Sequence, residues 1–320
     1  MSTRSNNHGR AYEYAWMTVL CSVLRRYRNV RIVENSSVTA NRRSWDALDA
    51  ETHNLFATSA AAAVDTILML EPKLTENVPE ELTFAFQQDQ TGIRGDVRDI
   101  VLRCASDGWE IGLSLKHNHE AVKHCRLSRV LDFGKEWFGV PCGADYWNDI
   151  RRIFDDLMEK RRQGWKWSDI PDKGRSVYLP LLTAFIGEVR RAYCRENRIL
   201  RRMMEYLIGT SDYYKVISHD TRRLTMIRTF NLHGTLGKPS GSRVSVMTIP
   251  VVELPSELIA LRVRPGSENT AEMYMNNGWQ VSFRIHSAST CVEPSLKFDV
   301  QFVGMPPSVL CIECRWRDGM

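Results

Sequence analysis

The sequence predicts a mixed α/β protein, and three parts of the chain indicate this fold class. Residues 95–128 contain two short aliphatic runs joined by a glycine-containing turn, which predict an antiparallel hairpin. The N-terminal region and residues 145–207 have apolar residues at helical spacing. Beyond Gly234 the chain changes to the short alternating runs that are typical of strands.

Composition limits the class of protein. A chain of 320 residues with 43% apolar content can bury one large core or two linked cores. The net charge of +5 identifies no partner by itself, but the clustered arginines suit bidentate contacts to phosphate and guanine. No apolar run reaches the roughly 18 residues that a membrane span needs. The eight scattered cysteines predict reduced thiols, as in a cytoplasmic protein.

Two helices and a strand are expected before the hairpin. The first helix runs from Ala11 to about Tyr27 with Glu13 in its first turn, and the second runs from Ala50 to Leu70. Residues 32–51 are polar and rich in turn-forming residues. Residues 82–86 alternate as a strand that leads toward the hairpin.

The hairpin holds the residues from which we predict chemistry. Its first run begins at Asp99, and its second run ends at Lys116. Ser114 and Lys116 share one face of the second strand because side chains alternate across a strand. A carboxylate can hold a divalent metal ion, and an ammonium group can neutralise charge on a phosphate and on the attacking water. The hairpin therefore predicts hydrolysis of phosphodiester bonds.

After the hairpin, the pattern predicts a helix at residues 118–131 and mainly helices at residues 145–207. Two strands follow at residues 213–217 and 224–230, one of which can return to the sheet of the hairpin. Further strands are expected in the C-terminal part, two of them flanking the turn signal Asn277-Gly278. Their ranges are 244–249, 258–263, 272–274, 279–286, 296–303 and 309–316.

The order of Asp99 and Lys116 on paired strands resembles the PD-(D/E)XK nuclease core, in which an acid is followed by an acid-X-lysine triplet on the next strand. Longer stretches resemble restriction endonucleases of the HaeIII type. They are GRAYEY (9–14), EIGLSLKHNH (110–119), DFGKEW (132–137), YLIGTSDYYK (206–215), FNLHGTL (230–236) and GWQVSFRIHSAS (278–289). The resemblance covers nearly the whole chain.

The resemblance implies a cytoplasmic, Mg²⁺-dependent type II restriction endonuclease that cuts double-stranded DNA within GGCC. It implies a PD-(D/E)XK core at residues 1–140, a mainly helical region at 141–233 and a β-rich DNA-recognition region at 234–320. A cognate DNA methyltransferase would protect the host, and no membrane is involved. A homodimer suits a palindromic target, and a monomer that cuts the two strands in turn is the alternative.

One position departs from the nuclease motif, because Ser114 stands where the motif has Glu or Asp. Glu110 shares its face but lies about 13 Å along the strand from it, too far to share an ion. We therefore expect the missing carboxylate from Glu13, since helix-borne glutamates often complete the site in this superfamily. Glu120 is the alternative to Glu13, and Asp96 is the alternative first acid.

The expected roles follow from these assignments. Asp99 and Glu13 hold Mg²⁺, with the backbone carbonyl of Leu115 as a further ligand. Lys116 orients the attacking water and stabilises charge on the phosphate, and Ser114 acts through an outer water. No covalent intermediate is expected.

DNA bases are expected to be read by a strand in the C-terminal region. Its alternating side chains share one face, and an arginine on a two-stranded ribbon in the major groove can pair bidentately with guanine. Asn118 and His119 are additional expected DNA contacts. The residues on the strand are Gln280, Ser282, Arg284 and His286.

Two other functions remain open from the sequence. One is a PD-(D/E)XK nuclease of DNA repair or recombination, which uses the same core without reading bases. The other is a catalytically silent DNA-binding protein, which the departure at Ser114 leaves open.

Overall fold

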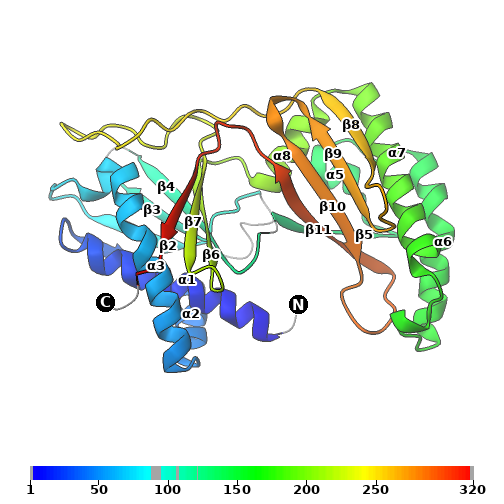
Figure 1. The fold of residues 1–320 in the computed structure, drawn as a ribbon, viewed down its shortest axis with the longest axis horizontal. Coiled ribbons are helices and arrows are strands. Elements are labelled where there is room, and N and C mark those ends of the chain that lie inside the picture. Colours follow the sequence, from blue (N-terminus) through cyan, green and yellow to red (C-terminus); the bar gives the residue numbers. More distant parts are fainter. Residues whose placement is uncertain (1–2, 88–94, 106–107, 121, 318–320) are drawn as a thin grey trace. The chain divides into compact units, whose positions relative to one another are not determined.

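The computed structural model describes residues 3–87, 95–105, 108–120 and 122–317. The chain forms two compact units, each with its own β-sheet (Figure 1). Unit 1 is Met1–Glu120, Thr210–Val252 and Pro307–Met320. Unit 2 is Ala121–Gly209 and Glu253–Pro306.

Unit 1 contains a mixed sheet of seven strands among the described residues, in the order β1-β2-β3-β4-β6-β7-β12. Two pairs of neighbours, β1 with β2 and β4 with β6, are parallel, and the others are antiparallel. The strands are β1 (Val30–Ile32), β2 (Leu82–Phe86), β3 (Ile100–Cys104), β4 (Glu110–His117), β6 (Tyr213–His219), β7 (Leu224–Phe230) and β12 (Cys311–Arg315).

Helices pack on one face of this sheet. They are α1 (Thr3–Leu24), α2 (Ser36–Asp46), α3 (Ala50–Leu70) and the short 3-10 helix η1 (Pro72–Thr75). Every second residue of β4, from Ile111 to Leu115, is buried in one hydrophobic cluster with α1 and α3. Ser114 and Lys116 therefore belong to the opposite face of the sheet, because side chains alternate along a strand.

Unit 2 contains a five-stranded antiparallel sheet among the described residues, in the order β5-β11-β10-β9-β8. Aromatic rings from α5 and α7, including Trp137 and Phe185, pack against Phe283 and Phe298 of the sheet. The strands are β5 (Lys123–Ser128), β8 (Leu258–Val263), β9 (Thr270–Met275), β10 (Gln280–His286) and β11 (Ser295–Gly304). The helices are α5 (Phe133–Phe138), α6 (Ala144–Arg162), α7 (Leu179–Arg195) and α8 (Ile199–Ile208), with short helical turns η2 (Trp167–Asp169), η3 (Gly174–Tyr178) and η4 (Asn276–Gly278).

The structure confirms the mixed α/β class and several predicted elements. The helix at residues 50–70 and the strand at residues 82–86 have the predicted bounds. The hairpin forms as β3 and β4, with Ile100 opposite Leu113. Both strands expected at residues 213–230 join the sheet that contains this hairpin.

Three predictions of secondary structure were wrong. Where they are described, residues 118–131 form no helix and instead contain β5, whose partner β11 is distant in the sequence. Residues 244–249 alternate in polarity but form no strand, and they run beside α3, where the Val246 N–H donates to the Met69 carbonyl at 3.1 Å. Residues 32–51 contain α2, which begins because the Asn35 side chain accepts a hydrogen bond from the Val38 N–H.

The two compact units begin and end at other residues than the three regions expected from the sequence. Strands β6 and β7 from the predicted helical region, and β12 from the predicted recognition region, lie in the sheet of unit 1. No helix of the described part of the chain is long and apolar enough to cross a membrane.

Candidate active site

Asp99 lies at the point where the chain enters β3, opposite the end of β4. Its N–H donates to the Leu113 carbonyl at 2.8 Å, which fixes the backbone. Its carboxylate oxygen Oδ2 accepts the Leu115 N–H at 2.6 Å and lies 3.3 Å from the Lys116 ammonium nitrogen. Asp99 and Lys116, which the sequence predicts as one site, are therefore in direct contact.

Lys116 keeps its positive charge in this setting. Its burial acts to lower the pKa of the ammonium group, but the nearby carboxylates of Asp99 and Glu13 outweigh this effect and raise the pKa. A charged ammonium group beside a carboxylate can bind a phosphate oxygen and can orient a water molecule.

Glu13 on α1 belongs to the same group of charges. Its Oε2 accepts a hydrogen bond from the Asn41 amide of α2 at 2.8 Å. Burial and then the negative charge of Asp99 raise the pKa of Glu13 to about 8, although Lys116 opposes this shift. The two carboxylates, from different elements, are thus close enough to repel each other, which is the arrangement that a divalent cation relieves.

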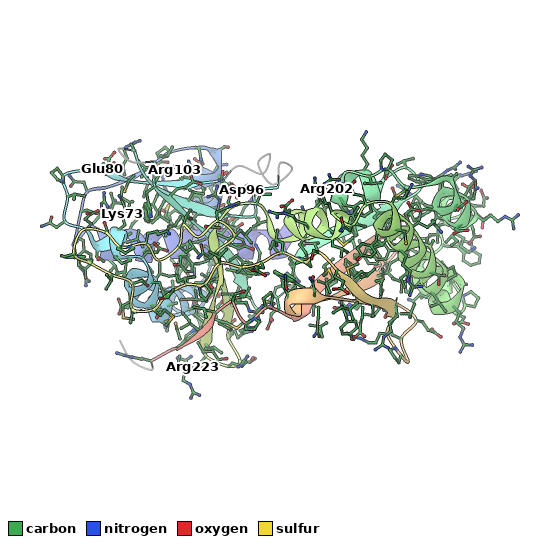
Figure 2. The ribbon with its side chains drawn as sticks, turned by 90° about the horizontal axis from the view of Figure 1, so that it is seen from above. Lys73, Glu80, Asp96, Arg103, Arg202 and Arg223 are labelled. Carbon is green, nitrogen blue, oxygen red and sulfur yellow. The ribbon has the colours of Figure 1, made fainter. Side chains whose placement is uncertain are left out.

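The other carboxylates that the sequence offers are held by arginine. Asp96 and Glu110 both bind Arg98, at 2.8 and 2.5 Å, and Arg103 also binds Glu110 at 2.8 Å (Asp96 and Arg103 are labelled in Figure 2). Arg98 lies directly over Gly112, where a Cβ atom would stand 2.0 Å from its Cδ. The missing side chain at position 112 thus makes room for this ion-pair network.

Glu120, the alternative to Glu13, pairs with Arg228 at 3.0 Å and lies 3.5 Å from the His219 ring nitrogen. Ser114 is buried and is the neighbour of Lys215 in the pairing of β4 with β6. The backbone N–H of Leu115 donates a hydrogen bond to the Asp99 carboxylate.

Comparisons with known proteins identify the family of this chain. The family model described as HaeIII restriction endonuclease matches residues 9–306. The type II restriction enzyme HaeIII from Haemophilus aegyptius is 43% identical over 319 residues, which cover 99% of this chain and 100% of that protein. No solved structure matches the chain.

The chain belongs to the HaeIII restriction endonuclease family.

Family membership confirms the predicted restriction endonuclease and favours it over a repair nuclease. It also implies a divalent metal cofactor. Among the described residues, no group of three or more His, Cys, Asp or Glu side chains could hold a metal ion.

A restriction endonuclease also reads DNA sequence, for which the predicted residues lie on β10 of unit 2. Strand β10 is the third strand of its sheet, so it is not part of an isolated two-stranded ribbon. Arg284 is exposed and pairs with the buried Asp299 at 2.9 Å. Ser282 is buried, and its hydroxyl lies 3.5 Å from the Gln301 carbonyl oxygen.

The four remaining predicted DNA contacts have different surroundings. The His286 ring bonds the Ser287 carbonyl at 2.8 Å, and Gln280 packs against Gly304. Asn118 has a positive φ of 52° and bonds Asp220 through both its amide nitrogen, at 2.7 Å, and its amide oxygen, at 2.9 Å. Asn118 thus ties the end of β4 to the turn after β6. His119 next to it is exposed.

Two side chains at the site carry no signal that the sequence analysis used. Asn41 was assigned to a polar connection, yet it is buried and bonds Glu13. Lys215 is buried beside Ser114, although its strand was predicted only from its apolar residues. Asn41 stands in none of the stretches that carry the resemblance, and Lys215 ends the stretch 206–215 without having been given a role there. The fold brings Asn41 to Glu13 and Lys215 to Ser114.

Proposed function

We propose that this restriction endonuclease is a type II enzyme that cleaves both strands of DNA within GGCC, and that its catalytic centre consists of Asp99, Glu13 and Lys116. The observation that carries this proposal is the contact of Asp99 with Lys116 at the end of the β3–β4 hairpin. The target sequence is inferred from the 43% identity to the HaeIII enzyme over the full length.

The carboxyl groups of Asp99 and Glu13 suit Mg²⁺, which prefers oxygen ligands and keeps several waters. Their mutual repulsion supports this assignment. The Leu115 carbonyl is a further proposed ligand, and Ser114 is proposed to act through an outer water. The metal ion, when bound, supplies Lewis acidity for the phosphate and for the attacking water.

The chain's own residues have distinct proposed roles in the hydrolysis. Two hydrogen bonds to the backbone of β4 hold Asp99 in place, so its carboxylate does not need to reorganise when DNA binds. Lys116 binds a phosphate oxygen and orients the attacking water. Asn41 holds Glu13 and keeps its carboxyl group directed toward the centre. This architecture agrees with a PD-(D/E)XK core in which the acid of the second strand has moved to a helix.

Base recognition is proposed for the face of β10 with Gln280, Ser282, Arg284 and His286, and Asn118 and His119 are proposed to contact DNA. Arg284 is the most exposed of the four on β10, and its pairing with Asp299 orients the guanidinium group. Ion pairing leaves other N–H groups of arginine available for guanine.

The cellular partners follow from this function. We infer that the enzyme is cytoplasmic, because the DNA that it cuts is found in the cytoplasm. We also infer a cognate methyltransferase that modifies the same DNA sequence. A homodimer would match the two-fold symmetry of GGCC.

Plasmid digestion tests the proposed function. Purified protein is incubated with a plasmid of known sequence in Mg²⁺ or in chelator, and fragment ends are mapped. Discrete fragments that end within GGCC, seen only with Mg²⁺, are expected. Ends in another sequence would overturn the proposed specificity, smears would indicate a nuclease without base readout, and intact DNA would indicate a silent DNA-binding protein.

A further inference from the structure

His117 is the last residue of β4 and directly follows Lys116. Its side chain shares a face of the strand with Leu115, which belongs to the hydrophobic cluster with α1 and α3. The centroid of the His117 ring accordingly lies 5.4 Å from that of Tyr12 on α1 and 4.7 Å from that of Phe56 on α3. The end of β4 thus packs against both helices through an imidazole ring.

The contact of Tyr12 with His117 connects the two halves of the proposed centre. Tyr12 is buried and immediately precedes Glu13 on α1, and His117 immediately follows Lys116 on β4. A shift of the His117 ring would therefore change how far Glu13 lies from Lys116. A displacement of about 1 Å in a catalytic group can lower a rate by roughly 100-fold.

The orientation of the His117 ring depends on Asp220, which lies in the turn between β6 and β7. The His117 side chain is only 16% exposed, so its polar ring needs a partner inside the protein. Its Nε2 lies 3.0 and 2.9 Å from the two carboxylate oxygens of Asp220. An ionised carboxylate only accepts hydrogen bonds, so Nε2–H is the donor. This bond holds the ring in one rotational position between the two helices.

Asp220 is itself held by Asn118, the residue after β4. The Asn118 amide nitrogen donates to the Asp220 carboxylate at 2.7 Å, and the Asp220 N–H donates to the Asn118 amide oxygen at 2.9 Å. The backbone N–H of Asn118 also donates to the Ser218 carbonyl of β6 at 2.8 Å. These bonds join the parallel strands β4 and β6 next to Lys116, so Asp220 orients the His117 ring from a fixed position.

We propose that Asp220 is a positioning residue of the metal centre. Through the His117 ring it sets the spacing between Glu13 on α1 and the pair of Asp99 and Lys116 on the sheet. The proposal rests on the proposed catalytic centre at these three residues. Asp220 is not itself a ligand, and it acts as the residues behind metal ligands do, whose change typically lowers metal affinity by about 10- to 100-fold.

The test separates metal affinity from DNA affinity and from stability. Ca²⁺, which takes oxygen ligands as Mg²⁺ does, is titrated by calorimetry into the complex of the protein with a GGCC duplex. DNA affinity is measured in chelator, and the melting temperature is measured for each variant. Asp220→Asn keeps the size of the side chain, and His117→Phe keeps an aromatic ring without the Nε2–H. Asp212→Asn is the matched control, because Asp212 is also buried in unit 1 and accepts three hydrogen bonds, but from His233 and Thr235.

Asp220→Asn and His117→Phe are each expected to lower the Ca²⁺ affinity by roughly 10-fold and to leave the DNA affinity in chelator unchanged. Both changes break the same hydrogen bond, so the double variant should lose no more Ca²⁺ affinity than the weaker of the two single variants. Asp212→Asn should keep the wild-type Ca²⁺ affinity even if its melting temperature falls.

Wild-type Ca²⁺ affinity in both single variants would overturn the proposal, as would additive losses in the double variant. An equal fall in DNA affinity would also overturn it, because Asp220 would then act on DNA through Asn118. If Asp220→Asn does not fold, His117→Phe decides the outcome by the same criteria. Asp99→Ala in the same titration tests the centre itself, which wild-type Ca²⁺ affinity of that variant would refute. A weakened Asp99→Ala together with an unchanged Asp220→Asn refutes only the role of Asp220.

Discussion

Both units carry charged side chains on the sheet face opposite to their helices, but they neutralise the acids differently. In unit 2, Asp299 pairs with Arg284 at 2.9 Å, and Glu272 pairs with Arg264 at 2.6 Å. In unit 1, Asp99 instead receives a backbone N–H and a lysine ammonium group. Arginine saturates a carboxylate with its planar fork of donors, whereas lysine is a single point charge. The acid without an arginine fork retains acceptor capacity for a metal ion.

The same contrast exists inside unit 1. Asp96 stands three residues before Asp99, yet it is bound by the guanidinium group of Arg98 at 2.8 Å. The type of residue therefore does not distinguish the proposed metal ligand from a structural acid. We infer that the partner of the carboxylate distinguishes them, and the following predictions test this rule.

The largest effect is expected at the centre itself. Asp99→Ala and Lys116→Ala should each lower the single-turnover cleavage rate by about 1000-fold or more, since the first removes a proposed metal ligand and the second removes the positive charge beside the reacting phosphate. Binding of DNA should persist, because most contacts to phosphate and bases lie elsewhere. Glu110→Gln is the control, because Glu110 is held by two arginines and should remain dispensable. Wild-type cleavage by either alanine variant would refute the centre.

Glu13→Gln should raise the Mg²⁺ concentration needed for half-maximal cleavage, or abolish cleavage. Glutamine keeps an acceptor for Asn41, so the melting temperature should change little. Asn41→Ala should lower the metal affinity by roughly 10-fold, as expected for a residue that positions a ligand. Titration of cleavage with Mg²⁺ measures both effects. If Glu13→Gln cuts normally and Glu120→Gln is inactive, the second acid is Glu120.

Arg284→Ala tests whether an arginine already paired with a carboxylate can still read DNA. We expect a loss of about 1–3 kcal/mol in binding to a GGCC duplex and almost none in binding to a scrambled duplex. A titration of both duplexes at several salt concentrations measures this difference. Equal losses on both, with a salt slope lowered by about one unit, would show a phosphate contact instead. The double variant Arg284→Ala/Asp299→Asn is the control. It removes the negative charge of Asp299, which the single variant would leave buried without its arginine partner.

The last effect is on stability and not on cleavage. It concerns Glu71, a buried acid whose hydrogen-bond donors among the described residues are neutral, the Tyr214 hydroxyl at 2.5 Å and the Gly237 N–H at 2.8 Å. Burial raises the pKa of Glu71 from 4.5 to about 7. Its stabilising contribution is therefore complete below pH 4.5 and is lost as the pH rises through 7. Between these limits, wild type should lose about 3 kcal/mol more unfolding free energy than Glu71→Gln. Denaturant titrations at several pH values measure the two curves, and parallel curves would contradict the raised pKa.

Sequence patterns predicted the secondary-structure elements that are determined by residues close together in the chain. The helix at residues 50–70 begins at an Asp49 cap and has a continuous apolar face, and the hairpin has its turn and both strands in one stretch. Asp99 and Lys116 could therefore be placed together before the fold was known. The prediction at β5 was wrong because its partner β11 is distant in the sequence. Without a neighbouring strand in the sequence, the residues of β5 alone do not distinguish a strand from a helix.

The remaining parts of the site depend on contacts that no local pattern encodes. Asn41 meets Glu13 only because α1 and α2 are brought together, and Lys215 meets Ser114 only because β6 pairs in parallel with β4. A parallel neighbour always comes from a distant part of the chain. The apolar residues around Lys215 indicate a buried strand. They do not show which side chains lie next to the Lys215 ammonium group, because those neighbours belong to other strands.

Strand β12 has a consequence for synthesis of the protein. It adds Cys311–Arg315 to the edge of β7, and the Trp316 indole bonds the buried Thr225 hydroxyl at 2.8 Å. Every segment of unit 2 precedes this strand in the chain, so unit 2 can fold on the ribosome while unit 1 still has an open edge at β7. The seven-stranded sheet of unit 1 is completed only after residue 315 has left the ribosome. The sheet that carries the proposed centre would thus gain its last strand late in translation, after the segments of unit 2 have been synthesised.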